Sequence, residues 1–394
     1  MIPNFPVYDA DNHIYEPEEA FLRHLPKQFA NDFYYVERNG KTKLVINGFL
    51  SEYIPNPTFD RVAAPGTHET FHRAKNTGGL SLRELQGKPI PTPKEWLNAQ
   101  ARLELLEQQG IYATLMFPTL GSVIEARLGD KPKTIAALFH SLNQWMFEEW
   151  TYAYKDRIFP VPFISLSDVS EAIKELELAI SRGARTVGVR PAPIPLVGGT
   201  TNYGYPEYDP FWARVCDAGI FVSLHSSDSG YDAISRNWLG NGREYLPFAQ
   251  SAFAGVTDPL GRAISDAMAA LICHGVFERH PKLRVVAVEN GAAWVPEFLK
   301  RLKKSYGQMP QAYKEHPVDQ FHKHVYVAPF YEDHMDELKA FIPVERMVFG
   351  SDFPHPEGPA EPLSYLKDFE SYSSDELHKV FSTNLKGLLE GRPN

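Results

Sequence analysis

Several short apolar segments of this chain end in side chains that could bind a metal ion. The first segment ends in Asp9-Ala10-Asp11-Asn12-His13. On an extended strand Asp9, Asp11 and His13 would point to the same side, because side chains alternate between the two faces. Buried carboxylate and imidazole groups are costly unless a partner satisfies them, and a divalent cation would do so. The competing interpretation is a turn with a capping aspartate and an exposed histidine.

Three later residues occupy the same kind of position. His225, Glu289 and Asp352 each end a run rich in Val, Phe or Leu. Taken singly, they could be a core histidine bonded to backbone, a surface glutamate and a helix-capping aspartate. Taken together they predict one site, because the carboxyl ends of barrel strands meet at one face. Glu289 could be a metal ligand, a partner of a ligating histidine, or a general base.

Further side chains are candidates for catalysis or substrate binding. His355 follows Asp352 closely and is a catalytic candidate. Arg190 ends another apolar run and could hold a substrate carboxylate, with a structural ion pair as the alternative. His68 and His72 share one face if their segment is helical, because they are four residues apart. They could bind substrate over the site, and a solvated loop is the alternative.

These residues need a scaffold, and the chain supplies alternating apolar runs and helical segments. Continuous apolar runs are typical of strands buried on both faces of a parallel sheet. The expected strands are 7–10, 112–117, 158–164, 186–190, 221–225, 284–289, 325–327 and 347–351. The expected helices are 94–109, 131–154, 170–181, 208–217, 260–279, 293–306, 333–341 and 375–389. About eight strand–helix repeats predict an α/β fold, a distorted (β/α)₈ TIM barrel. A doubly wound open sheet is less favoured, since no glycine-rich phosphate loop follows the first strand.

Two long insertions interrupt this alternation, at about 18–93 and 226–260. The first is expected to contain a hairpin over 33–50 around Asn39-Gly40, and the second carries Arg243, a further candidate for substrate contact. Insertions that follow barrel strands project over the C-terminal face, where sites are built. No linker separates two folding units, so residues 1–394 are expected to form a single domain.

Composition narrows the class of protein further. The chain has 394 residues, with 40 Lys and Arg against 49 Asp and Glu, a net charge of −9. This acidic balance argues against nucleic acid or an anionic membrane as the main partner. The start of the sequence has no secretory signal, and two cysteines fit a reducing compartment, so a cytoplasmic location is expected.

The chain resembles the amidohydrolase superfamily, in particular the amidohydrolase-related branch that includes aminocarboxymuconate-semialdehyde decarboxylase. The resemblance covers essentially the whole chain. It rests on residues 8–13, Ser223-Leu224-His225, residues 275–285, Gly291 with Trp294, and residues 349–355. It implies a barrel with a metal at its C-terminal mouth. It also implies that Asp11, His13, His225 and Asp352 hold this metal.

Two positions differ from many members of that family. Asp11-Asn12-His13 stands where many have His-x-His, and an anionic ligand moves the preference from zinc towards manganese or iron. Glu289 stands where many have a histidine, so the acid–base role would pass to Glu289 or be lost. No lysine is placed at a strand end as a carboxylated bridge, so a lysine-bridged binuclear hydrolase is not supported.

The leading interpretation is a metal-dependent enzyme that acts on a small organic acid or carbonyl compound by hydrolysis or non-oxidative decarboxylation. Its cofactor would be a divalent metal, Zn, Mn or Fe, and its catalytic candidates are Glu289, Asp352 and His355. One alternative is a dinuclear Fe or Fe/Mn oxygenase on the same fold. Another is a non-catalytic partner subunit of a hetero-oligomer that keeps a metal site. The resembled branch generally forms oligomers, so a homo- or hetero-oligomer is expected.

Overall fold

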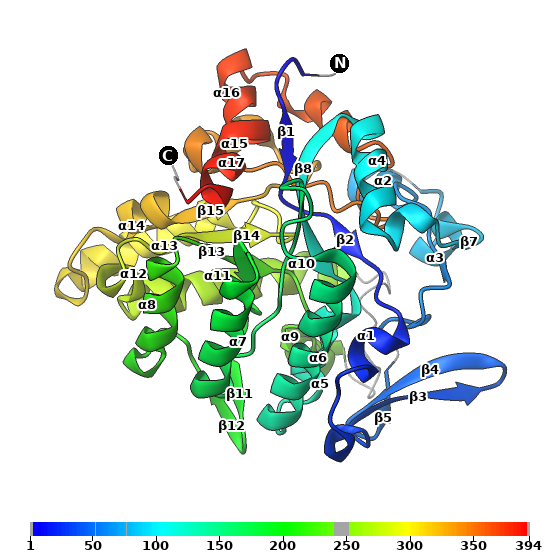
Figure 1. Ribbon diagram of the computed structural model, residues 1–394. Coiled ribbons are helices and arrows are strands. Elements are labelled where there is room, and N and C mark those ends of the chain that lie inside the picture. The colour runs from blue at the N-terminus through cyan, green and yellow to red at the C-terminus, as the bar shows by residue number, and fades with distance from the viewer. Residues whose placement is uncertain (1–2, 52, 76, 240–251, 392–394) are drawn as a thin grey trace.

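Parallel strands form the centre of the molecule (Figure 1). The computed structural model describes residues 3–51, 53–75, 77–239 and 252–391, so Arg243 lies outside the described residues. Within them, eight parallel segments follow one another in chain order around the barrel. They are β1 (Val7–Asp9), β8 (Ile111–Pro118), β9 (Ile158–Pro160), β10 (Thr186–Gly188), β13 (Phe221–His225), β14 (Val285–Val288), β15 (Val325–Val327) and residues 347–349. The predicted (β/α)₈ fold is confirmed.

At three places around the barrel, neighbouring segments are joined by a single residue pair or hydrogen bond. Phe163 pairs with Gly188 between β9 and β10, and Val327 pairs with Met347 after β15. The Ala10 N–H donates to the Phe349 carbonyl at 2.7 Å, which returns the chain to β1. The eighth segment is thus held by isolated bonds on both sides, and it is too short to form a regular strand.

Several strands are shorter than the sequence predicted, for identifiable reasons. β9 ends at Pro160 because Pro160 and Pro162 have no N–H to donate to a neighbouring strand. β14 ends at Val288 because Glu289 adopts a left-handed backbone with φ of 55°. The carboxylate of Glu289 therefore follows the strand in a turn.

Helices cover the outside of the barrel (Figure 1). Asn98 and Asp168 cap the helices α4 (Ala99–Gln109) and α7 (Val169–Ser181) by accepting from backbone amides, and Gly110 ends α4 with φ of 76°. The predicted helix at 333–341 is only one turn, and α14 is a helix that the sequence did not predict. The helices are α4 (Ala99–Gln109), α5 (Ile124–Arg127), α6 (Pro132–Trp150), α7 (Val169–Ser181), α8 (Asp209–Asp217), α11 (Pro259–Cys273), α12 (Val276–Arg279), α13 (Val295–Gln308), α14 (Pro317–His324), α15 (Met335–Leu338), α16 (Ser374–His378) and α17 (Asn384–Leu389).

The first insertion contains the predicted hairpin. β3 (Phe33–Arg38) pairs with β4 (Lys41–Ile46), and β4 with β5 (Phe49–Leu50). The turn residues Asn39 and Gly40 have φ of 54° and 67°, as a type I′ turn requires. The rest of the insertion holds α1 (Glu18–Leu22), β6 (Arg61–Val62), α2 (Glu69–His72), α3 (Leu82–Gln86) and β7 (Ile90–Pro91).

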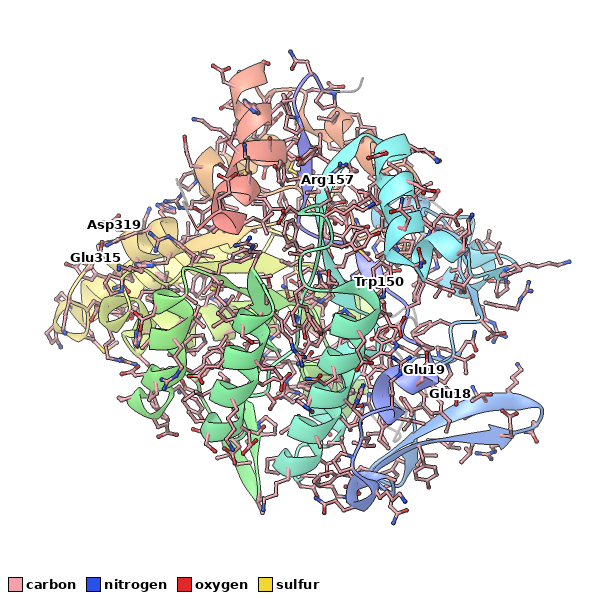
Figure 2. All side chains as sticks on the ribbon, viewed as in Figure 1. Glu18, Glu19, Trp150, Arg157, Glu315 and Asp319 are labelled. Atoms are coloured by element: carbon pink, nitrogen blue, oxygen red, sulfur yellow. The ribbon has the colours of Figure 1, made fainter. Side chains whose placement is uncertain are left out.

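The second insertion contains α9 (Tyr231–Leu239) and α10 (Ala252–Thr257) among its described residues. A separate hairpin, formed by β11 (Ile194–Leu196) and β12 (Gly199–Thr201), follows the fourth barrel strand, β10. Trp150 at the end of α6 is buried, while Glu19 and Asp319 are exposed (Figure 2). Within the described residues, no helix is both long and apolar enough to cross a membrane.

Candidate metal centre

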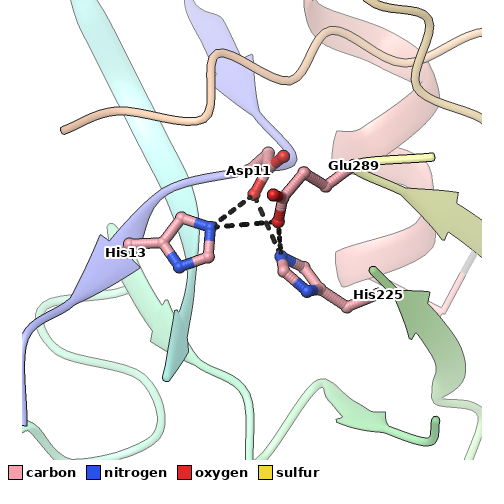
Figure 3. Close-up of side chains that lie close together, drawn as sticks. All are labelled: Asp11, His13, His225 and Glu289. Carbon is pink, nitrogen blue, oxygen red and sulfur yellow. Dashed lines mark ion pairs between the residues drawn. The ribbon is translucent and has the colours of Figure 1, made fainter. Parts of the chain in front are cut away.

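Four side chains converge at the C-terminal ends of barrel strands (Figure 3). Asp11 lies in the turn after β1, and His13 begins the short strand β2 (His13–Ile14), which pairs with the end of β8. His225 ends β13, and Glu289 directly follows β14. Strands far apart in the sequence therefore deliver two carboxylates and two imidazoles to one point.

The spacing of these groups suits a single ion. His13 Nε2 lies 3.3 Å from Asp11 Oδ1 and 3.6 Å from Glu289 Oε2. His225 Nε2 lies 3.5 Å from Asp11 Oδ1 and 2.9 Å from Glu289 Oε2. Ligand atoms about 2.1 Å from a central ion are about 3.0 to 3.4 Å apart in octahedral or tetrahedral geometry. The observed distances therefore match the edges of a coordination polyhedron.

The atoms that face the centre lack other partners. Asp11 Oδ1, His13 Nε2 and His225 Nε2 are buried and have no conventional hydrogen-bond partner among the described residues. Buried polar atoms are normally satisfied, so an unsatisfied cluster calls for a missing group. A divalent cation fits, because imidazole nitrogen and carboxylate oxygen are both common metal ligands.

Asp352 and His355 form a second group around the same histidine. Asp352 Oδ1 lies 3.3 Å from His13 Nε2 and 2.8 Å from His355 Nδ1. His355 stacks on His13 with ring centroids 3.8 Å apart. Among the described residues, His13, Glu289, Asp352 and His355 form one compact ligand-capable group, and Asp11, His13, His225 and Glu289 form the other. Glu289 thus belongs to both groups, whereas the resemblance implied Asp352 as the fourth ligand.

The close packing of these groups shifts their pKa values. Burial alone would lower the pKa of His225, but Glu289 and Asp11 raise it to about 9. Burial opposes the charged form of Glu289, yet the neighbouring histidines hold its pKa well below the usual range. Burial and the charge of Glu289 raise the pKa of Asp352 well above its ordinary value. In the metal-free protein these side chains therefore carry protons, which a cation would displace when it binds.

Hydrogen bonds fix which ring nitrogen of each histidine faces the centre. Thr119 Oγ1 lies 2.9 Å from the Ile14 carbonyl, 3.1 Å from His355 Nε2 and 3.4 Å from His13 Nδ1. A carbonyl only accepts, so the single hydroxyl proton goes to Ile14 and Thr119 accepts from the rings. His225 Nδ1 likewise donates to the Ser226 carbonyl at 2.6 Å. His13 and His225 therefore both present Nε2 to the centre.

Backbone strain accompanies the site. Glu289 and Asp352 have φ of 55° and 58°. Left-handed backbone is uncommon outside glycine, and it persists where the surrounding structure holds it in place. For Asp352 part of that support is its N–H, which donates to the Asp11 carbonyl at 2.9 Å.

Asp9 does not join the cluster, which corrects one expectation. Its side chain is fully buried and accepts from Ser351 N–H at 2.9 Å and from Ser351 Oγ at 2.6 Å. The alternation of an ideal strand fails here because β1 ends at Asp9 and the chain turns before β2. Only Asp11 and His13 of the first motif face the centre.

The predicted substrate-binding residues lie outside both ligand-capable groups. Arg190 donates to the carbonyls of Asp228 and Pro193, and its Nε lies 3.5 Å from Glu125. It lines a small cavity beside His225 whose free volume, about 10 Å³, accommodates roughly one water molecule.

The two histidines of the first insertion differ from each other. His68 is buried, and its Nε2 donates to the Leu82 carbonyl at 3.2 Å. Its backbone N–H donates to the Pro356 carbonyl, which brings the first insertion against the loop after the eighth segment. His72 is partly exposed and lies 3.9 Å from Glu332. His68 is therefore not in a solvated loop.

Two residues that support the site were not predicted from the sequence. Thr119 directly follows β8 and bonds His355, so its position at the carboxyl end of a barrel strand could have identified it. Glu16 accepts from the amides of Thr119, Leu120 and Gly121 at 3.1, 3.1 and 2.9 Å, which holds the loop that carries Thr119. No local signal in the sequence predicts that contact.

Comparison with known proteins agrees with this architecture. The family model described as amidohydrolase matches residues 93–384. The structure is similar to an amidohydrolase from Mycobacterium avium subsp. paratuberculosis K-10, with 37% identity, a TM-score of 0.91, and coverage of 98% of this chain and 99% of that one.

More distant solved structures share the fold. A 2,6-dihydroxybenzoate decarboxylase from Rhizobium is 19% identical, with a TM-score of 0.57 and coverage of 84% of this chain and 97% of that one. A 5-carboxyvanillate decarboxylase from Novosphingobium aromaticivorans DSM 12444, solved with bound manganese, is 14% identical, with a TM-score of 0.59 and 98% coverage of both chains. The family match and the 37% identity over nearly the full length confirm the resemblance that the sequence motifs indicated: the chain belongs to the amidohydrolase family.

Proposed function

We propose that this protein is a metal-dependent enzyme that removes carbon dioxide from a small organic acid without oxidation. The observation that carries the proposal is the set of buried ligand atoms on Asp11, His13 and His225, which have no hydrogen-bond partner among the described residues and lie within 3.6 Å of one another or of Glu289. Decarboxylases of aromatic acids have the same fold, and one was solved with manganese. The two carboxylates in the donor set favour manganese or iron(II) over zinc.

We propose that Asp11, His13, His225 and Glu289 hold one ion. Both ligand-capable groups share His13 Nε2, and one imidazole nitrogen binds one ion, which favours a mononuclear site over the dinuclear oxygenase alternative. When bound, a divalent cation would polarise a substrate oxygen. The low pKa of Glu289 keeps it ionised, so it suits a ligand better than a proton donor.

The proton for the product carbon is proposed to come from the pair formed by Asp352 and His355. Loss of carbon dioxide leaves an electron pair on carbon, and that carbon must receive a proton. His355 Nδ1 and Asp352 Oδ1 are 2.8 Å apart, and Thr119 accepts from the opposite nitrogen of the ring. Burial lowers the pKa of His355 to about 4, whereas burial and the charge of Glu289 raise the pKa of Asp352, so the shared proton resides on Asp352 and His355 orients it. His355 and Asp352 are also slightly exposed, with side chains 12% and 9% accessible. Arg190, His68 and His72 stay candidates for substrate contact.

Hydrolysis at the same site is the second candidate. It is favoured by the name of the 37% identical relative, an amidohydrolase. In that reaction Asp352 would accept a proton from the attacking water. We further propose that the protein is cytoplasmic and that it assembles into at least a dimer.

The test uses the purified chain loaded with Mn²⁺ and incubated with 2,6-dihydroxybenzoate, 5-carboxyvanillate and simple amides and esters. Carbon dioxide release and product formation are measured by chromatography. Turnover of an acid by this chain alone would exclude the partner-subunit alternative. Turnover of amides or esters without carbon dioxide release would overturn decarboxylation in favour of hydrolysis. Oxygen consumption during turnover would instead favour the oxygenase alternative.

Two variants test the assigned roles. His355→Gln should slow turnover about 10²- to 10⁴-fold while metal content is unchanged. His225→Ala should lose most bound metal. His140→Gln is the matched control, because His140 lies on α6, is 46% exposed and, within the part of the chain that the structure describes, bonds Glu175. Wild-type turnover in His355→Gln would contradict the proposed role of the Asp352–His355 pair in proton transfer.

A further inference from the structure

A hydrogen-bonded network of four buried polar side chains runs from α4 to the loop that carries Asp352. Arg102 on α4 donates through Nη1 to Asn12 Oδ1 at 2.8 Å. Asn12 Nδ2 donates to Asp9 Oδ2 at 2.8 Å, and Ser351 Oγ donates to the same oxygen at 2.6 Å. The other oxygen of Asp9 accepts from the backbone amides of Asp11 and Ser351 at 3.1 and 2.9 Å. All four side chains are at most 1% exposed.

Two members of this network are sequence neighbours of residues that face the metal centre. Asn12 stands between Asp11 and His13, and Ser351 directly precedes Asp352. Arg102 also donates through Nη2 to the His13 carbonyl at 3.0 Å. None of the four side chains belongs to either ligand-capable group. Their bonds hold the backbone that carries three residues of the site.

The network also joins a buried carboxyl group to a buried guanidinium. Asp9 is fully buried, and its four hydrogen bonds come from neutral donors. Arg102 is the cation at the other end of the network, and its Nε is engaged by the Glu95 carbonyl at 2.9 Å. A buried carboxylate is costly unless an opposite charge or strong hydrogen bonds compensate it. Asn12 links the two groups, and its amide orientation is set by donating to one and accepting from the other.

We infer that Arg102, Asn12, Asp9 and Ser351 act as positioning residues that fix Asp11, His13 and Asp352 for metal binding. The inference rests on the proposed metal site. Partners that orient metal ligands commonly change metal affinity 10- to 100-fold when they are replaced. Replacing Arg102 removes the donor to both Asn12 and the His13 carbonyl. The ligands then lose their fixed positions, and the metal must order them on binding.

The experiment measures the dissociation constant of Mn²⁺ by electron paramagnetic resonance of the free ion, on folded protein well below its unfolding temperature. Arg102→Met should weaken Mn²⁺ binding 10- to 100-fold. Arg102→Lys should fall between the wild type and Arg102→Met, because lysine restores the charge but not the fork of donors. Arg284→Met is the control: Arg284 donates to backbone carbonyls before β14, at the opposite end of the barrel. It should unfold more easily without a change in Mn²⁺ affinity.

Ser351→Ala removes one hydroxyl and provides the second, milder variant. It should weaken Mn²⁺ binding at least threefold, and it decides the matter if Arg102→Met does not fold. Wild-type affinity in folded Arg102→Met, or in Ser351→Ala where Arg102→Met does not fold, would overturn the inference and leave the proposed function intact. Failure of the wild type itself to bind Mn²⁺ would instead overturn the proposed metal site.

Discussion

Acidification should weaken metal binding, because a cation must displace a proton from His225. In the metal-free protein the pKa of His225 is raised to about 9: burial opposes the charged ring, but Glu289 Oε2 at 2.9 Å and Asp11 at 3.5 Å favour it more strongly. Its Nδ1 is committed to the Ser226 carbonyl, so the displaced proton is the one on Nε2, the atom that faces the centre.

The expected loss of metal affinity follows from the difference between the pH and the pKa of His225. At pH 7 the ring is about two units below its pKa, and each unit corresponds to 1.36 kcal/mol. Removal of the proton therefore costs about 2.7 kcal/mol, which weakens the apparent affinity about 100-fold. Between pH 6 and 8 the dissociation constant should fall about tenfold per pH unit from His225 alone. The pKa of His13 is raised well above its ordinary value too, so the dependence can be steeper.

The assay is isothermal titration calorimetry with Mn²⁺ at pH 6, 7 and 8, in two buffers that differ in ionisation enthalpy. The difference between buffers counts the protons released, and at least one proton per ion is expected at pH 7. His140→Gln should release the same number of protons as the wild type, because His140 lies outside the site. A dissociation constant that is flat from pH 6 to 8, or binding without proton release, would refute the reasoning.

Four further predictions follow from the same contacts. Glu289→Gln should reduce bound metal by close to one equivalent, because it removes an anionic ligand; elemental analysis measures this, and wild-type metal content with wild-type turnover would place Glu289 outside the site. Glu16→Gln should lower the free energy of unfolding by about 1 to 3 kcal/mol, since the carboxylate satisfies three backbone amides; an unchanged urea midpoint would contradict this. In metal-free protein, the pKa of His225 is raised from 6.5 to about 9, so its contribution to stability is complete below about pH 6.5 and is lost as the pH rises through 9, by about 3 kcal/mol in urea unfolding; no loss over that range would argue against the ion pair with Glu289. Light scattering should give at least twice the chain mass of 44.6 kDa, because large apolar side chains such as Trp238 and Val256 are 77% and 86% exposed; a monomer at micromolar concentration would contradict it.

Local features of the sequence determined the class of fold and most of the centre. Apolar runs separated by capped helices indicate buried parallel strands whatever their partners, and Asn39-Gly40 selects a type I′ hairpin by itself. The position of His225 and Glu289 at strand ends followed from the same pattern, because barrel geometry gathers the carboxyl ends of strands at one face. Motif resemblance then supplied the family, and the family match confirmed it.

Tertiary structure alone decided how the polar residues divide between the centre and its support. Asp9 and Asp11 are alike in type and spacing, yet Asp9 turns to Ser351, which is 342 residues away, and Asp11 turns to His13 and His225. The turn between β1 and β2 breaks the alternation that a strand would keep, and hydrogen bonds to the eighth segment determine the result. Arg102, His68 and Thr119 acquire their partners in the same way. Which buried donor meets which acceptor depends on contacts between segments distant in sequence, and local periodicity carries no information about them.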